Sequence, residues 1–358
     1  LINIRARKLF REVYMIYSKL RFVFSALLGI IVATSFLVPA AKADRLASVK
    51  KAGVLHCGIV PGLPGYGAPN KSGKIVGFDI DLCHAIAAAI LGDATKVKLT
   101  KQNLPTAFGA MKAGTVDVVT HRFTWTFGRD VGQGLNYTKV MVWDGQGFMV
   151  RKKLGVKSVK DLSGATVCLS AGSTTQGNVA DYFKANGMTY KEVTFASMGE
   201  SQKGYDAGRC DVFSSDKFGL GARTRSMKNP GEHMILPEQI SNEPIGPMVA
   251  HGDDNWRDLV FWVLNALVAA EELGITKGNV DQMKSSSKNA FAQRLLGVKG
   301  KFASKIGLSK DWAYNAIKAV GNYGEIWENH LGSKGLGMPR GRNELVKNGG
   351  LMISMPFR

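Results

Sequence analysis

From Val54 onward, short apolar runs alternate with helix-like segments, and this alternation leaves the chain few folds to adopt. In the first series, the strand-like runs are residues 54–60, 97–99 and 116–119, and the helix-like segments are residues 78–91 and 107–112. Gly92 and Gly114 follow the two helical segments, where a glycine commonly ends a helix. This β-α-β-α-β order predicts a mainly parallel sheet with helices on its faces.

The same order begins again at Ala165, after an extended stretch over residues 145–151. Its strand-like runs are residues 165–169, 193–195 and 210–213, and its helical segments are residues 178–185 and 202–207. A second extended and proline-rich stretch, residues 237–250, then leads away from this unit. Two α/β units with two crossovers between them predict two lobes joined by a two-segment hinge.

The chain after the second crossover is predicted to be helical and to return to the first unit. Residues 255–274 form an amphipathic pattern rich in Trp, Leu and Ala, and a helical tail follows over residues 275–358. We therefore expect lobe 1 to comprise residues 44–146 and 245–358, including this C-terminal extension, and lobe 2 to comprise residues 147–244.

Residues 1–43 have the layout of a secretory signal peptide. Basic residues precede an apolar run at 22–38, and Ala41 and Ala43 provide the small residues that a signal peptidase reads. The alternative is a transmembrane anchor, because a run of 17 residues is at the lower limit for spanning a membrane. The small residues after the run favour cleavage, so we expect a mature chain that begins at Asp44.

The excess of positive charge does not indicate a nucleic-acid-binding protein. Residues 1–43 hold seven of the 47 Lys and Arg and one of the 28 Asp and Glu, so the formal charge of residues 44–358 is +13. The basic residues are scattered, and no recognisable nucleic-acid-binding module contains them. Export also argues against nucleic acid as a partner, so we interpret the charge as a basic surface.

Four cysteines predict disulfides in an exported chain. They are Cys57, Cys83, Cys168 and Cys210, and they form neither a C-x-x-C pair nor a Cys/His cluster with the spacing of a zinc site. Four cysteines allow three pairings, and four buried free thiols are the alternative. If each lobe folds by itself, the pairs are Cys57–Cys83 and Cys168–Cys210, each worth roughly 3–4 kcal/mol in the chain-entropy model.

Open α/β sheets bind ligands beyond the carboxyl ends of their strands, which directs attention to the loops after Val60, Val119, Leu169 and Phe213. In the loop after Val119, Arg129 offers paired N–H donors that suit a carboxylate, and Thr124 adds a hydroxyl. The alternative is a solvated loop in which Arg129 pairs with the neighbouring Asp130.

Two loops of the second unit carry further polar residues. After Leu169, Ser173 and Thr174 open a helix whose free N–H groups favour an anion, although plain N-capping explains these residues equally well. After Phe213, Asp216 can pair with an ammonium group, and the alternative is again an N-cap.

The sequence contains no recognisable catalytic motif. It has no P-loop, no zinc-hydrolase motif and no G-x-S-x-G elbow. An enzyme on the same fold, a dehydratase or lyase acting on a small carboxylic acid, would need a positioned acid or base. His121 and Glu200 are the candidates, and neither has an evident partner in the sequence. A third interpretation is a ligand-sensing domain that docks on a receptor. We expect no catalytic residue, no metal and no cofactor.

Four of these segments carry a family resemblance: residues 77–82, 126–129, 172–175 and 215–216. They resemble the solute-binding proteins of ABC importers of the polar amino acid type, family 3. The match is closer to the general L-amino acid-binding group, through segments such as residues 144–150, 178–183, 236–241 and 320–325. The resemblance implies a periplasmic binding protein-like α/β fold, and it implies that the chain is the periplasmic substrate-binding component of an amino acid ABC importer.

The resemblance also implies roles for single residues. Arg129 would hold the α-carboxylate of the ligand, helped by Ser173 and Thr174. Thr124 and Asp216 would take the α-ammonium group.

The side chain of the ligand would meet a second set of residues. Tyr66 would lie against it. The chain departs from the group at His121-Arg122-Phe123, where relatives usually have Arg-Asn-Thr. The resemblance implies that these positions, His121 among them, face the ligand, so the extra cation of Arg122 and the bulk of Phe123 would alter which side chains fit. The expected partners are free L-amino acids and the permease subunits in the inner membrane, and we expect a monomer.

Overall fold

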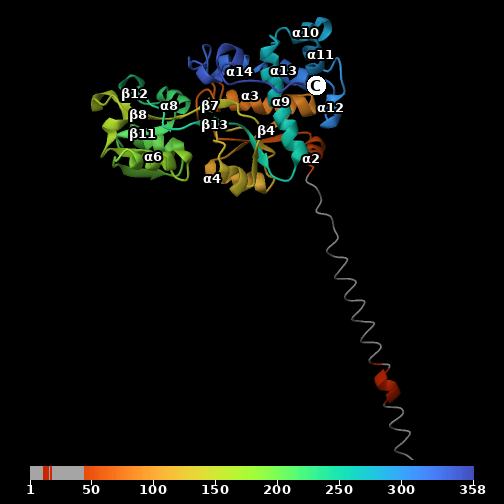
Figure 1. Ribbon diagram of the computed structural model, residues 1–358, viewed down its shortest axis with the longest axis horizontal. Coiled ribbons are helices and arrows are strands. Elements are labelled where there is room, and N and C mark those ends of the chain that lie inside the picture. The colour runs from red at the N-terminus through yellow and green to blue at the C-terminus, as the bar shows by residue number, and fades with distance from the viewer. Residues whose placement is uncertain (1–10, 16, 18–43) are drawn as a thin grey trace, which may run out of the picture. The chain divides into compact units, whose positions relative to one another are not determined.

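The computed structural model of the protein describes residues 11–15, 17 and 44–358. The predicted signal peptide, residues 1–43, therefore lies almost wholly outside the described residues. Residues 44–358 belong to one unit of the structure, whose helices and strands are labelled in Figure 1. Among the described residues, no helix is both long enough and apolar enough to cross a membrane.

The first series of strands forms a five-stranded sheet in the order β4-β1-β5-β14-β6. β4, β1 and β5 are parallel, whereas β14 runs antiparallel to both β5 and β6. β14 follows the second sheet in the sequence, so the chain crosses back to the first sheet there. The bounds are Leu55–Ile59 for β1, Val97–Lys101 for β4, Val118–Val119 for β5, Leu135–Tyr137 for β6 and Met248–Ala250 for β14.

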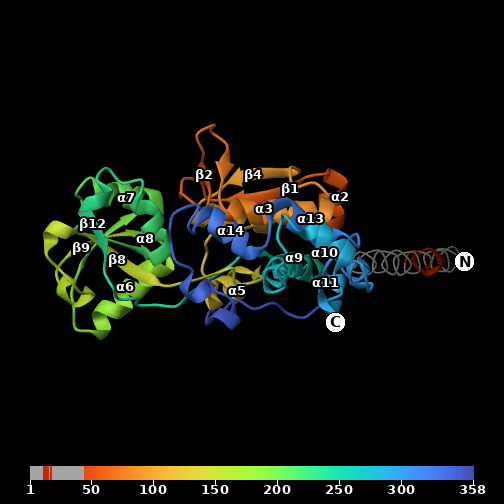
Figure 2. The same ribbon diagram turned by 90° about the horizontal axis from the view of Figure 1, so that it is seen from above.

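The second series forms another five-stranded sheet, in the order β10-β9-β11-β8-β12. β10, β9 and β11 are parallel, and β8 runs antiparallel to β11 and β12. Figures 1 and 2 show this sheet beside the first one, with its own helices around it, as the sequence predicts for two α/β lobes. The bounds are Gln146–Arg151 for β8, Thr166–Ser170 for β9, Lys191–Phe195 for β10, Val212–Asp216 for β11 and His233–Ile235 for β12.

Two chain segments connect the sheets, and they pair with each other. β7 (Val142–Asp144) and β13 (Glu243–Ile245) form an antiparallel ladder that places Asp144 opposite Glu243. The first connecting strand therefore precedes the extended stretch predicted at 145–151, most of which becomes β8. The described strands are completed by a short hairpin of β2 (Ala68–Pro69) and β3 (Ile75–Val76).

The helices around the two sheets follow the predicted pattern with small shifts at their ends. α3 has buried residues on most of its sides and ends at Gly92, which takes a left-handed conformation with φ of 71°. α6 begins four residues before the predicted start at 178, because the Ser173 side chain caps it. The bounds are Arg45–Ala52 for α2, Phe78–Leu91 for α3, Leu104–Lys112 for α4, Phe127–Gln133 for α5, Thr174–Ala185 for α6, Met198–Asp206 for α7 and Lys217–Thr224 for α8. Three 3₁₀ turns lie at Lys152–Leu154, Val159–Leu162 and Pro230–Glu232.

The C-terminal helices cover the side of α3 that faces away from the first sheet. α9 and α13 lie against α3 (Figures 1 and 2), and the alanines of α3 let these helices approach closely. Phe78 of α3 packs edge to face against Tyr323 and Trp327, with ring centroids 6.0 and 6.1 Å apart. The bounds are Asp254–Glu272 for α9, Val280–Ser286 for α10, Ala290–Leu295 for α11, Phe302–Lys305 for α12, Trp312–Val320 for α13 and Tyr323–His330 for α14, with 3₁₀ turns at Gly341–Asn343 and Val346–Asn348.

The tail also reaches the hinge and the second sheet. The fully buried Asn343 accepts a hydrogen bond from the Trp143 N–H at 2.6 Å and donates one to the Trp143 carbonyl at 3.0 Å, so its side chain continues the ladder of β7. Trp327 contacts Phe218 of α8, with ring centroids 5.3 Å apart. The tail thus touches the hinge and both lobes.

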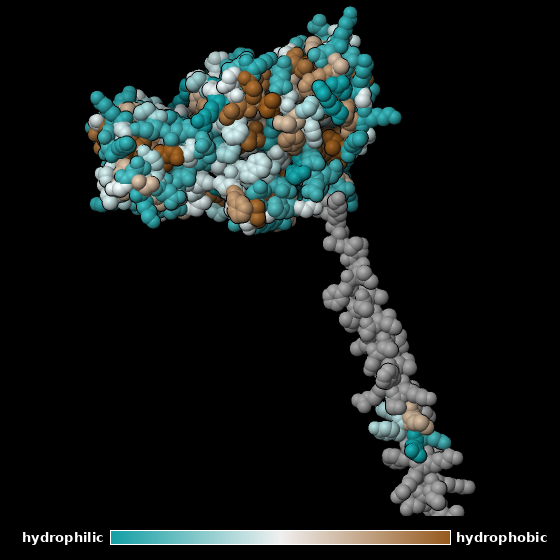
Figure 3. All heavy atoms as spheres, viewed as in Figure 1, coloured by the Kyte–Doolittle hydropathy of each residue, from teal (hydrophilic) through white to brown (hydrophobic). Residues whose placement is uncertain are grey.

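The apolar residues of these helices point inward. On the face drawn in Figure 3, hydrophilic residues predominate among the described residues, and the hydrophobic ones form small separate groups. α9 accordingly places a continuous stripe of Leu, Val and Ala in the core of the first lobe.

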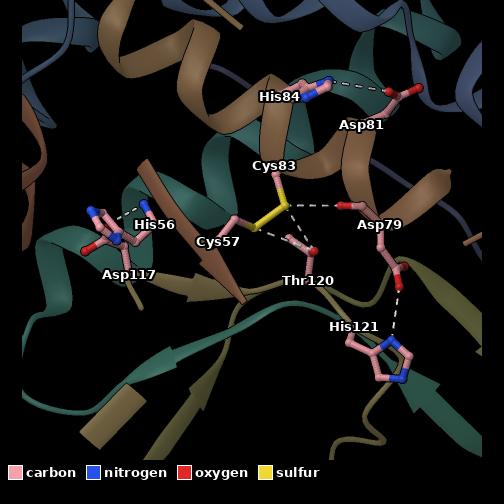
Figure 4. Close-up of a disulfide and its surroundings, with 9 residues drawn as sticks. All are labelled: His56, Cys57, Asp79, Asp81, Cys83, His84, Asp117, Thr120 and His121. Atoms are coloured by element: carbon pink, nitrogen blue, oxygen red, sulfur yellow. Dashed lines mark hydrogen bonds and ion pairs between the residues drawn. A yellow bond between two sulfur atoms is a disulfide. The ribbon is translucent and has the colours of Figure 1, made fainter. Parts of the chain in front are cut away.

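One disulfide lies in each lobe. Cys57 of β1 is bonded to Cys83 of α3, and Cys168 of β9 is bonded to Cys210, which stands two residues before β11. This is the pairing expected for lobes that fold by themselves. Figure 4 shows the first disulfide joining the sheet to α3 beside the Thr120 hydroxyl, which lies 3.3 Å from the Cys83 sulfur.

Replacing Asn343 tests whether the tail supports the hinge. Asn343→Ala leaves the N–H and carbonyl of Trp143 without these partners, so we expect the free energy of unfolding to fall by about 2–3 kcal/mol. Urea denaturation of the purified protein measures it. Asn348→Ala, at an exposed position of the same tail, is the control and should change stability by about 0.5 kcal/mol or less. Equal effects of the two variants would contradict this role.

Candidate functional site

A cavity of about 650 Å³ lies where the parallel strands of both sheets end. The loops after β1, β4 and β5 line it from the first lobe, and the loops after β9, β10 and β11 line it from the second. Both lobes therefore follow the rule that open α/β sheets bind ligands beyond the carboxyl ends of their strands. The predicted site residues among its lining are His121, Arg122, Thr124, Arg129, Ser173, Thr174 and Asp216.

Arg129 is held at the cavity without an acidic partner. Its Nη1 donates to the Thr124 carbonyl at 2.9 Å, and its guanidinium lies 5.8 Å from the ring centroid of Phe108. Asp130 instead accepts a hydrogen bond from the Trp125 indole at 2.9 Å, so the Arg129–Asp130 surface pair does not form. No described carboxylate is at ion-pair distance from Arg129, which leaves its remaining donors available to an anion.

The Arg122 side chain crosses from the first lobe to the second. Its Nη1 lies 3.0 Å from the Asp216 carboxylate and 3.9 Å from that of Asp144, and all three side chains are largely buried. The guanidinium also packs 4.7 Å from the Tyr66 ring centroid and against the Cα of Gly219, where a Cβ atom would lie only 2.7 Å from an Arg122 nitrogen. The absence of a side chain at Gly219 makes room for Arg122.

This buried cluster contains one more acidic group than basic groups. Burial raises the pKa of Asp216, and Arg122 counteracts that shift. Burial likewise raises the pKa of Asp144, and the nearby charge of Asp216 adds to the increase. With its pKa raised to about 8, Asp144 is largely protonated at neutral pH, so Arg122 and Asp216 carry the opposite charges of the cluster.

Hydroxyl groups from the two lobes meet beside the cluster. The Thr124 and Thr174 side-chain oxygens are 3.5 Å apart, and the Thr124 carbonyl also accepts a hydrogen bond from the Tyr137 hydroxyl at 2.8 Å. Ser173 acts as the N-cap of α6, because its hydroxyl accepts from the Gln176 N–H at 3.2 Å. The turn at Ser173 thus both caps α6 and lines the cavity.

Two predicted residues have surroundings that the sequence did not reveal. His121 does have a carboxylate partner, because its Nδ1 lies 3.2 Å from Asp79 of α3 (Figure 4). Burial lowers the pKa of His121 and raises the pKa of Asp79. Tyr66 was expected against the ligand but is not among the lining residues; it is fully buried beneath Arg122.

Sequence reasoning missed several lining residues, of which Arg223 is the most notable. It lies on α8 beyond Asp216, and no motif marks it. The sequence gives one indication of its position: Arg223 follows Gly219 by four residues, so both lie on the same face of α8. Asp144 was also missed as a site residue, because only the fold brings it beside Arg122.

Comparisons with known proteins agree with this fold. The model of the bacterial extracellular solute-binding proteins, family 3, matches residues 55–279. The general L-amino acid-binding periplasmic protein AapJ of Rhizobium johnstonii is 48% identical over 89% of this chain and 94% of AapJ. The glutamate/glutamine/aspartate/asparagine-binding protein BztA of Rhodobacter capsulatus is 47% identical over 93% of this chain and 99% of BztA.

A solved structure is similar over nearly the same range. It is a periplasmic binding protein of an ABC transporter from Brucella ovis with glutathione bound, with a TM-score of 0.86 and 46% sequence identity, covering 88% of this chain and 100% of that one. The family match over residues 55–279, together with relatives nearly half identical along most of the chain, shows that the chain belongs to the bacterial extracellular solute-binding proteins, family 3.

Proposed function

We propose that the chain is the periplasmic substrate-binding component of an amino acid ABC importer. It captures free L-amino acids between its lobes and delivers them to permease subunits in the inner membrane. In this proposal residues 1–43 are a cleaved signal peptide, and the mature chain acts as a monomer. The names of AapJ and BztA, both amino acid-binding proteins, support the ligand class.

One observation carries the proposal: a guanidinium and a carboxylate from opposite lobes face the same cavity. Arg129 has no acidic partner, and Asp216 has Arg122 as its counter-ion, which also lies 3.9 Å from the Asp144 carboxyl group. The α-carboxylate of an amino acid would bind Arg129 with help from the turn at Ser173 and Thr174, and its α-ammonium group would bind Asp216 and Thr124. A zwitterion would thereby complete both half-sites.

The position of these groups on two lobes connects binding to closure. We propose lobe boundaries at 146/147, shortly after β7, and at 244/245, within β13. Because Arg129 comes from lobe 1 and Asp216 from lobe 2, a ligand makes both contacts only when the lobes are together, and it therefore favours the closed state. An amino acid has about ten non-hydrogen atoms, which suffices for sub-micromolar affinity at the small-ligand limit.

The cavity can hold more than the smallest amino acids. Its volume of about 650 Å³ is typical of pockets for larger ligands, and the Brucella ovis relative contains the tripeptide glutathione. The expected contact between Tyr66 and the ligand would require Arg122 to move aside, so Arg122 and His121 are better placed to contact the ligand side chain. The enzyme alternative gains a partner for His121 in Asp79, but the family and its relatives are binding proteins.

Replacing Arg129 tests the carboxylate half-site. We expect Arg129→Ala to weaken binding of L-amino acids by about 2–4 kcal/mol, roughly 30- to 1,000-fold in Kd, because the ligand carboxylate would lose charged hydrogen bonds. Isothermal titration calorimetry measures the Kd. Arg257→Ala, on α9 and outside the cavity lining, should bind as the unmodified protein does. Near-normal affinity of Arg129→Ala would refute the assignment.

Replacing Asp216 tests the ammonium half-site. The unmodified protein should bind an amino acid at least about 100-fold more tightly than the 2-oxo acid with the same side chain, because the latter lacks the ammonium group. In Asp216→Asn we expect this preference to fall to within about tenfold. Competition calorimetry with the two ligands measures the ratio, and circular dichroism establishes that the variant is folded. A folded variant with an unchanged preference would disprove the role of Asp216.

A further inference from the structure

Arg223 is a buried cation with no acidic partner. It lies on α8, is only 7% exposed and is part of the cavity lining. Its Nη1 donates to the Gln202 side-chain oxygen at 2.9 Å, and its Nε has no hydrogen-bond partner. A buried charged group normally has a counter-charge and a full set of hydrogen bonds, so this one is incomplete.

The neighbouring Arg122, unlike Arg223, has acidic partners. Arg122 packs against Gly219, four residues before Arg223, so the two guanidinium groups lie near the same face of α8. Arg122 has Asp216 and Asp144 as partners, whereas Arg223 forms no ion pair with any carboxylate in residues 44–358. The acidic groups of the cluster are thus closest to the other arginine.

The other acidic residues that line the cavity near Arg223 do not provide its counter-charge. Glu200 and Asp206 of α7 also line it, but neither is at ion-pair distance from Arg223, and one Asp206 oxygen accepts the Lys228 N–H at 3.2 Å. Lys203 adds a further cation at the edge. Burial, together with repulsion from Arg122, lowers the pKa of Arg223 to about 9, so the group is still charged at neutral pH.

We propose that Arg223 forms a second anion-binding subsite in the cavity, which takes a carboxylate of the ligand other than its α-carboxylate. The inference rests on the proposed function, with Arg129 holding the α-carboxylate and Asp216 the ammonium group. It assigns the preferred ligands to one chemical class, α-amino acids that carry a second carboxylate. Acidic amino acids and small γ-glutamyl peptides both belong to this class.

The test compares ligands of the same shape that differ in charge. L-glutamate and L-glutamine are nearly isosteric, so their Kd ratio in calorimetry reports the subsite. We expect the unmodified protein to bind glutamate at least about tenfold more tightly than glutamine. In Arg223→Gln the ratio should fall to within about twofold, with the Kd for glutamine little changed. A γ-glutamyl dipeptide, titrated in parallel, shows which of the two sources of the second carboxylate binds more tightly.

Two further variants serve as a charge control and as an alternative replacement of Arg223. Lys228→Gln removes one positive charge from an exposed position shortly after α8 and should preserve the ratio. If Arg223→Gln does not fold, Arg223→Met keeps an apolar stem of similar length, removes the charge and should likewise abolish the preference.

Three results would separate the inference from the proposed function. A glutamine preference in the unmodified protein would overturn the Arg223 subsite and leave amino acid binding intact. Equal weakening of both ligands by Arg223→Gln would also overturn it, because it would indicate a structural role through Gln202. If the unmodified protein binds no amino acid at all, the proposed function itself fails.

Discussion

The ion pair between Arg122 and Asp216 holds the two halves of the cavity together. Arg122 follows β5 in the first sheet and Asp216 ends β11 in the second, and the pair is buried with Asp144 as a further acidic neighbour. Burying the Arg122 guanidinium without a carboxylate partner would cost free energy. Its position over the Tyr66 ring and against Gly219 therefore depends on the ion pair with Asp216. The contact also occupies the carboxylate expected to meet the ligand ammonium group. A ligand must therefore share Asp216 with Arg122 or displace it, which makes Arg122 part of the energetics of binding.

The cavity separates its charges into three regions. In the Arg122–Asp216–Asp144 cluster two acidic groups share one guanidinium, whereas Arg129 and Arg223 each lack an acidic partner. An ammonium group flanked by two carboxylates would match all three regions. A simple zwitterion would match two and leave Arg223 uncompensated. Electrostatic matching of this kind selects among ligands of similar size, because a mismatched ligand leaves a buried charge without a partner.

The C-terminal tail gives the first lobe a second layer and connects it to the hinge. α3 is enclosed between the sheet on one side and α9 and α13 on the other, which explains why so few of its residues are polar. Asn343 then continues the β7 ladder, and Trp327 touches Phe218 on α8. Movement of the second lobe about β7 and β13 would alter these contacts, so the tail contributes to the balance between open and closed arrangements.

The sequence by itself determined the elements and their order. Apolar runs, glycine stops and helix caps act over a few residues, so they predicted the parallel strands of both sheets, α3, α9 and the loops that carry Arg129 and Asp216. It also predicted the four residues of the disulfides but left their pairing conditional on how the lobes fold. Only the tertiary structure decided which charges meet. The contacts of Arg122 with Asp216, His121 with Asp79 and Asn343 with β7 join residues between 42 and 200 positions apart, and the isolation of Arg223 depends on all its neighbours at once. Local patterns contain no information about such distances, because they arise from the packing of the two sheets and the tail.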